Sequence, residues 1–182
     1  MKPIYEYKPK RKNKTALLLT AATALASATL LAVAWTLDPT VKNLCLLFGA
    51  LFLEISVLLA GRYLLRDYFY ALFDSDGSVD FVVVEQKGKK RSVVCRIAVS
   101  DVRTLVASKK ERDAFAEGES MRNYDYCMDI GAEGAKYLCL IEDGKRVSVK
   151  FTPNERMTEL LNALIHPSEA NGEASDGGVA QE

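Results

Sequence analysis

An acidic residue, Glu54, lies inside a long apolar stretch of the sequence. A carboxyl group within a membrane is rare, and it usually faces a helix interface or a water-filled cavity. An earlier apolar stretch carries hydroxyls at helical spacing and at about the depth of Glu54, namely Thr20, Thr23 and Ser27. We expect these hydroxyls to contact Glu54 and to hold a helical hairpin or a homo-oligomer together. A proton or ion pathway is the alternative, but two helices cannot enclose a path by themselves.

A second group of residues that could bind a ligand is basic and lies near the middle of the chain. It comprises Lys87, Lys89, Lys90, Arg91 and Arg96, most of them around a predicted turn at 87–90. If this turn faces a bilayer, each cation contributes about 1 kcal/mol of attraction to anionic lipid headgroups. The alternative is a solvated hairpin tip whose lysines protect the edge of a sheet.

Residues for catalysis or metal binding are scarce. The cysteines at 45, 95, 127 and 139 match no zinc or disulfide spacing, and His166 is the single histidine. The sequence has no glycine-rich phosphate loop and no nucleophile with a matching base. We therefore predict no enzymatic activity, no cofactor and no metal. Because 24 basic residues balance 24 acidic ones, we also expect no nucleic-acid partner.

Two apolar stretches must position Glu54. Residues 16–37 carry no charge, and at about 1.5 Å per residue they span the hydrocarbon core of about 30 Å. A second stretch at 44–61 is interrupted only by Glu54, and the proline-containing segment 38–43 between them is short enough for a tight turn. The sequence therefore predicts a two-helix transmembrane hairpin at 16–65.

Basic residues near the ends of these stretches predict the orientation. The N-terminal segment 1–15 is rich in Lys and Arg, Lys42 alone lies in the turn, and Arg62 and Arg66 follow the second stretch. The positive-inside rule then puts the N-terminus and the C-terminal domain on the cytoplasmic side of the plasma membrane. A cleaved signal peptide is the alternative, but the first stretch exceeds the usual apolar region of about 7 to 15 residues.

Beyond Arg66 the pattern changes to alternating apolar and polar residues, which is typical of strands with one buried face. The polar segment 108–120 is expected to be an exposed loop with a turn of helix. In the clearest strand, 121–130, the inward face is predicted to carry Tyr124, Tyr126, Met128 and Ile130, and the outward face Asn123, Asp125, Cys127 and Asp129. The seven predicted strands are 68–73, 79–86, 91–99, 102–107, 121–130, 136–141 and 146–151.

A helix closes the predicted domain. Thr152 is expected as its N-cap, Pro153 as its first residue, and Glu155 as the partner of the cap in a capping box. One stripe of this helix carries Met157, Leu160, Leu161 and Leu164, and it must be buried against the sheet. We expect residues 66–166 to form a cytoplasmic domain with a complete core, and 167–182 to be a disordered acidic tail.

Seven antiparallel strands followed by one amphipathic helix resemble the pleckstrin-homology fold. The chain resembles bacterial membrane proteins that place a PH-like domain directly after a two-helix hairpin. The resemblance covers 16–165 and is carried by the paired apolar stretches, the strand 80–85, the hairpin 87–96 and the closing segment 151–164. It implies a membrane α-helical hairpin followed by a mainly-β domain, a PH-like open barrel or sandwich with a C-terminal α-helix.

The resemblance also implies a binding function. In lipid-binding members, basic residues around the first hairpin loop clamp phosphorylated inositol headgroups, whereas the corresponding loop here, 74–78, is acidic. We therefore expect a membrane-tethered scaffold that docks a protein partner or anionic lipid at the inner membrane face. The alternatives are a structural subunit of a larger membrane complex and a proton- or ion-coupled oligomer that uses Glu54.

Overall fold

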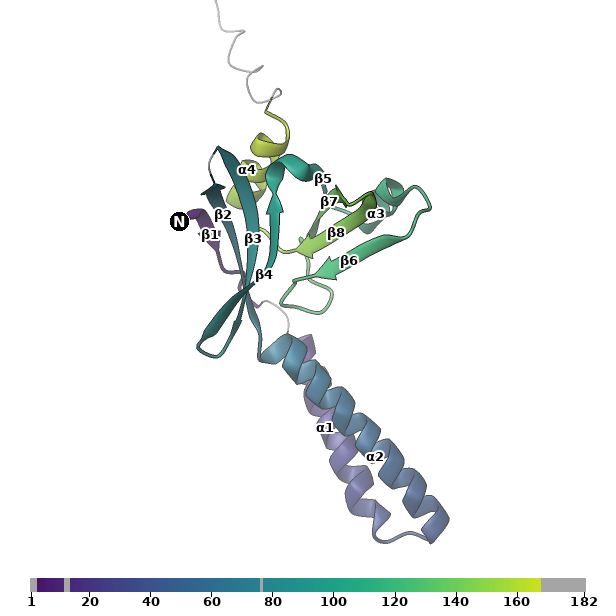
Figure 1. The fold of residues 1–182 in the computed structure, drawn as a ribbon. Helices are drawn as coiled ribbons and strands as arrows, with labels where there is room; N and C mark the ends of the chain where they lie inside the picture. Colours follow the sequence, from purple (N-terminus) through teal and green to yellow (C-terminus); the bar gives the residue numbers. More distant parts are fainter. Residues whose placement is uncertain (1–2, 12–13, 76, 168–182) are drawn as a thin grey trace, which may run out of the picture.

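The computed structural model describes residues 3–11, 14–75 and 77–167. Two long antiparallel helices project from one end of a β-rich domain, in which two sheets face each other (Figure 1). Except for Pro167, the segment predicted to be a disordered acidic tail lies outside the described residues.

The helical hairpin consists of α1 (Thr15–Ala34), α2 (Pro39–Leu59) and a π-helical turn, η1 (Ala60–Leu64), that continues α2. Both helices are long and apolar enough to cross a membrane. The second helix begins earlier than predicted, because Pro39 occupies the first turn of a helix, where its missing N–H costs no hydrogen bond. The connection between the helices is therefore shorter than 38–43.

Small residues allow the two helices to approach each other closely. The Ser27 hydroxyl donates to the Gly49 carbonyl at 2.7 Å, and the Ser56 hydroxyl donates to the Thr20 carbonyl at 3.1 Å. A Cβ atom at Gly49 would lie 2.9 Å from the Leu31 side chain, so the contact needs a glycine at this position. These contacts follow the rule that small and hydroxyl-bearing residues mediate helix packing in membranes.

The first sheet has the strand order β1-β2-β3-β4 and is antiparallel throughout. Its strands are β1 (Pro3–Tyr7), β2 (Asp67–Ser75), β3 (Ser78–Lys87) and β4 (Lys90–Ala98). The sequence predicted no strand in the basic segment 1–15. The structure nevertheless pairs β1 with β2, although the whole helical hairpin separates these two strands in the sequence. Tyr5 and Tyr7 of β1 pack against the hydrophobic core.

The second sheet has the strand order β5-β7-β8-β6. Its strands are β5 (Val102–Val106), β6 (Met121–Asp125), β7 (Lys136–Glu142) and β8 (Lys145–Phe151), and a short 3-10 turn, η2 (Val99–Asp101), precedes β5. β6 runs parallel to β8, so the prediction of seven antiparallel strands was wrong in strand number and in this pairing. The open PH-like architecture itself is confirmed.

The predicted strand 121–130 ends at Asp125, and its predicted faces were right for Tyr126 and Met128 but wrong for Tyr124 and Cys127. Cys127 and Met128 are both buried, whereas Tyr124 is exposed. The Asp125 carboxylate accepts a hydrogen bond from the Cys127 amide at 2.9 Å, a local turn that takes the chain out of the sheet. Alternation is lost at this turn, which the sequence pattern does not reveal.

Two further helices complete the domain, α3 (Lys109–Ala116) and α4 (Glu155–Ile165). α3 begins with a capping box between Ser108 and Glu111, within the segment predicted as a loop with a turn of helix. The N-cap of α4 is Asn154, whose side chain accepts from the Met157 amide at 3.0 Å. The predicted cap at Thr152 was therefore wrong, and the helix begins two residues later.

The core lies between the two sheets and extends under α4. Tyr70, Phe81 and Phe151 form an aromatic cluster with ring centroids 4.9 to 6.3 Å apart. On the predicted stripe of α4, Met157 and Leu161 are fully buried and Leu160 is partly buried. Leu164 is 38% exposed. The helix thus covers the sheet as predicted, through a narrower stripe.

Candidate membrane-facing surface

The basic hairpin between β3 and β4 lies at the end of the domain that carries the helices. Asp67, the first residue of β2, pairs with Gln86 of β3, so the tip at 87–90 extends past the point where the helices join the sheet. Figure 1 shows this tip beside the top of the helical hairpin. Gly88 adopts a φ of 57°, which a tight turn needs at this position. The hairpin therefore points toward the bilayer surface of a membrane that contains the helices.

The cations of this hairpin differ in their partners. Lys87 pairs with Glu85 at 3.4 Å, and Arg91 lies 3.8 Å from the Glu6 carboxylate and 4.5 Å from the centre of the Phe69 ring. Lys89 and Lys90 are exposed and form no ion pair in the described part of the chain. These two lysines are available to an anion outside the protein.

Arg96 does not belong to this cluster. It lies opposite Val82, several residues from the tip, and its guanidinium pairs with the Asp80 carboxylate at 2.5 Å. The prediction that groups Arg96 with the hairpin lysines was wrong, because β4 carries it toward the far end of the sheet.

Basic residues of the N-terminal segment lie at the same end of the domain. Lys8 and Arg11 both pair with Asp67, at 2.8 and 3.0 Å, and Arg11 also donates to the Arg66 carbonyl at 2.8 Å. Lys10 and Lys14 are exposed, and neither forms an ion pair with a described residue. The sequence indicates only that these basic residues orient the helices, whereas the pairing of β1 with β2 brings them to the domain surface.

Arginines at the end of the helical hairpin fix the domain to the helices. The Arg62 guanidinium donates to the Tyr68 hydroxyl at 2.5 Å and also to the Asp125 carbonyl. Arg66 donates to the Gly61 carbonyl at 3.0 Å and pairs with the largely buried Glu85 carboxylate at 3.0 Å. These charge-assisted bonds join the helices to both sheets and so determine which end of the domain faces the membrane.

Glu54 and its expected partners are not brought together within one chain. The three hydroxyls donate to backbone carbonyls, Thr20 to Ala16 at 2.7 Å, Thr23 to Leu19 at 3.0 Å, and Ser27 to Gly49 at 2.7 Å. Glu54 is exposed on the outer face of α2. Ser56 faces α1, and residues two apart on a helix are rotated by about 200°, so Glu54 faces away.

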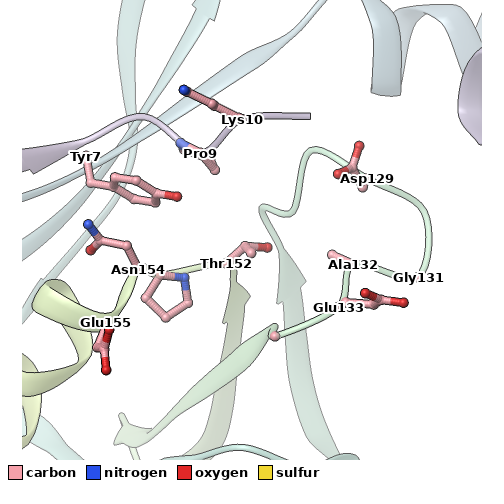
Figure 2. A pocket seen from close by; sticks show the side chains of 12 residues that line it. Tyr7, Pro9, Lys10, Asp129, Gly131, Ala132, Glu133, Thr152, Asn154 and Glu155 are labelled. Atoms are coloured by element: carbon pink, nitrogen blue, oxygen red, sulfur yellow. The ribbon is translucent and has the colours of Figure 1, made fainter. Parts of the chain in front are cut away.

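A cleft of about 540 Å³ lies where three segments meet (Figure 2). Tyr7 and Lys10 come from the N-terminal segment, the loop 129–134 forms the opposite wall, and Asn154 and Glu155 begin α4. The Asn154 side chain donates to the Tyr5 hydroxyl at 2.7 Å and so joins α4 to β1. Among the described residues that line the cleft, Lys10 is the only lysine or arginine, so this lining lacks the group of cations that would hold a phosphate.

The thiols are poor nucleophiles in this fold. Burial raises the pKa of Cys95 and Cys139 to about 11 and that of Cys127 to about 12, so all three remain protonated at neutral pH. Among the described residues, no group of three or more His, Cys, Asp or Glu side chains could hold a metal ion.

Comparison with known proteins supports the architecture. The family model described as "Bacterial PH-like domain (DUF6106)" matches residues 5–168. No curated protein and no solved structure matches the chain. The matched region begins in β1 and ends after α4, so the helical hairpin lies within it. The chain therefore belongs to the bacterial PH-like domain family.

Proposed function

We propose that this protein is a membrane-tethered binding module whose PH-like domain rests on the anionic cytoplasmic leaflet of the plasma membrane. The observation that carries the proposal is the position of the β3–β4 tip, which presents Lys89 and Lys90 beside the end of the helices. PH-like domains are generally non-catalytic binding modules, which agrees with this assignment.

The number of exposed cations at this end suits orientation of the domain. Lys10, Lys14, Lys89 and Lys90 are exposed there without an ion pair to a described residue. Each cation near an anionic surface contributes about 1 kcal/mol. Because the helices already hold the domain at the membrane, the effective lipid concentration is high and a few kcal/mol suffice to fix its orientation.

The contact is with leaflet charge and not with one phosphoinositide headgroup. The first hairpin turn of the domain, between Ser75 and Ser78, lies at the end of β2 that is remote from the helices. Asp74 precedes this turn, so the loop that clamps phosphates in lipid-binding PH domains is here acidic and distant from the bilayer.

Hydrogen exchange on the full chain in nanodiscs tests this function. We expect the amides of 87–91 to exchange more slowly when phosphatidylserine is added to phosphatidylcholine, because lipid contact excludes water. The paired change Lys89→Glu and Lys90→Glu should abolish this difference. A matched control, Lys109→Glu with Lys110→Glu in α3, should retain it. Equal exchange in the two lipids for the unmodified chain would contradict the proposal.

A second candidate function is a structural subunit of a larger membrane complex. It is favoured by the exposure of Glu54 on the outer face of α2, because a membrane carboxyl group usually contacts protein or a water-filled cavity. The partner on this face would be a transmembrane helix of a second copy or of another protein. A proton- or ion-coupled oligomer would use the same face, and the substitutions described in the Discussion distinguish these roles.

A further inference from the structure

A groove of about 570 Å³ lies between the two sheets, on the side where the barrel is open. Residues Val94 to Ala98 of β4 form one wall, and Tyr124 and Tyr126 lie at the other. Within the described residues, β4 pairs only with β3 and β6 pairs only with β8, so each presents an unpaired strand edge. The floor consists of apolar core side chains, including Ile97, Leu140 and Val147.

Apolar and aromatic side chains are exposed along the groove, among the polar ones. Val94, Tyr124 and Ile141 are 38%, 42% and 45% exposed. The rings of Tyr124 and Tyr126 are stacked with centroids 6.4 Å apart, and the Tyr126 hydroxyl donates to the Val94 carbonyl at 3.3 Å. That long hydrogen bond crosses the groove from the end of β6 to the edge of β4. Proteins usually cover an exposed strand edge such as that of β4 or protect it with charged side chains.

The rim of the groove is acidic. Asp101, Glu142 and Asp143 line it, and none of them forms an ion pair within the described part of the chain. Among the described residues that line the groove, Arg96 is the one cation, and Asp80 neutralises it. The charge therefore favours a basic occupant. It disfavours anionic lipid and also the residues after 167, which carry acidic side chains and no basic one.

We propose that this groove binds an extended segment of a partner protein in which apolar and basic residues alternate. The segment adds to the free edge of β4 as a strand, and its backbone supplies the missing hydrogen-bond partners. Alternate side chains of a strand point to opposite faces, so its apolar residues contact the floor while its basic residues reach the acidic rim. The inference does not depend on the proposed lipid contact.

A direct test uses the full chain in phosphatidylcholine nanodiscs, which lack the anionic lipid of the first proposal. The probe is a synthetic octapeptide of alternating valine and lysine, and the comparison peptide alternates valine and glutamate. We expect the lysine peptide to bind and to slow hydrogen exchange in 93–98 and 121–126 without affecting β1. We expect the glutamate peptide to bind at least about tenfold more weakly, because like charges oppose each other at the rim.

Variants assign the binding to the groove. Glu142→Lys should weaken binding of the lysine peptide about tenfold. Asp74→Lys, an exposed acidic position outside the groove, should leave it unchanged. No binding of the lysine peptide, equal binding of the two peptides, protection confined to β1, or equal effects of the two variants would each overturn the proposal.

Discussion

At the scale of single residues, Glu54 allows the sharpest distinction between a structural and a chemical role. Glu54→Gln retains hydrogen-bonding capacity and removes only the charge, so a contact with another transmembrane helix should survive. Glu54→Leu should weaken association by about 1 to 2 kcal/mol, the usual scale for such bonds in membranes. Energy transfer between labelled chains, or recovery of a co-purifying partner, measures both effects. A Gln variant that assembles normally and has lost its cellular function would show that the titrating group itself is needed.

A second residue-scale prediction concerns Tyr70, whose ring is fully buried in the core. Its hydroxyl donates to the Tyr126 carbonyl at 2.9 Å and accepts from the Thr152 amide at 3.3 Å. Burial raises the pKa of Tyr70 well above its ordinary value, so the hydroxyl remains a donor at neutral pH. Tyr70→Phe removes both bonds and should lower the free energy of unfolding by about 1 to 3 kcal/mol.

Thermal unfolding of the full chain in detergent measures this loss. Tyr124→Phe is the control, because Tyr124 is exposed and no hydrogen bond of its hydroxyl is found in the described structure. If Tyr70→Phe proved as stable as the control, the Tyr70 hydroxyl would have no structural role.

At the scale of elements, β1 is part of the PH-like domain, so the domain is incomplete without the N-terminal segment. The strand is separated from β2 by the entire helical hairpin, and Tyr5 and Tyr7 contribute to the core. A fragment 66–166, which we expected from the sequence to have a complete core, lacks this strand and exposes the edge of β2. We predict that it is less stable and more prone to aggregation than a chain that contains β1.

The contact between Arg11 and Arg66 suggests the matching control. Their 2.8 Å hydrogen bond brings the two ends of the domain together, so a short Gly-Ser linker can join residue 11 to residue 66 in place of the helices. This joined fragment should be a soluble monomer with a higher unfolding temperature than 66–166. Equal stability of the two fragments would mean that β1 is dispensable.

Sequence patterns predicted the elements that depend on local signals. The apolar stretches gave the two helices, and alternation gave the hairpins of β2, β3 and β4. The sequence pattern did not predict β1, because five residues in a basic segment form a strand only by pairing with a partner that is distant in the sequence. Likewise, alternation in 121–130 concealed the local turn at Asp125, and Thr152 resembled an N-cap as closely as Asn154 does.

The surface at the membrane was predictable only in part. The lysines of the β3–β4 turn are evident from their spacing, but the register that places Gln86 opposite Asp67 is needed to bring them to the helices. Glu54 was correctly found to be unusual, whereas its orientation depends on which face of α2 packs against α1. A single sequence does not specify that face when nearly every residue is apolar.

At the scale of the whole molecule, the two helices lie in the sequence between β1 and β2, two strands that pair with each other in one sheet. Because β1 precedes α1 and β2 follows η1, both ends of the hairpin must emerge on the side of the membrane that holds the domain. The basic residues at these ends predict the cytoplasmic side. Reporters fused before residue 16 and after residue 182 should both be cytoplasmic, and one at Thr40 should be external. An external C-terminal reporter would contradict this orientation.

If lipid charge holds the β3–β4 tip at the membrane surface, the tip lies closer to the lipid headgroups than the β2–β3 turn does, and spin relaxation measures this difference in distance. A nitroxide at Ser92→Cys, next to the tip, is compared with one at Ser78→Cys, at the remote turn, with Cys45 and Cys95 replaced by serine. In nanodiscs with a lipid-anchored nickel chelate, we expect faster relaxation of the nitroxide at position 92 than of the one at position 78. Phosphatidylserine should increase the difference, but not when Lys89 and Lys90 are changed to glutamate. Equal relaxation at the two positions, or a difference that does not depend on lipid charge, would show that lipid charge does not hold the tip at the membrane.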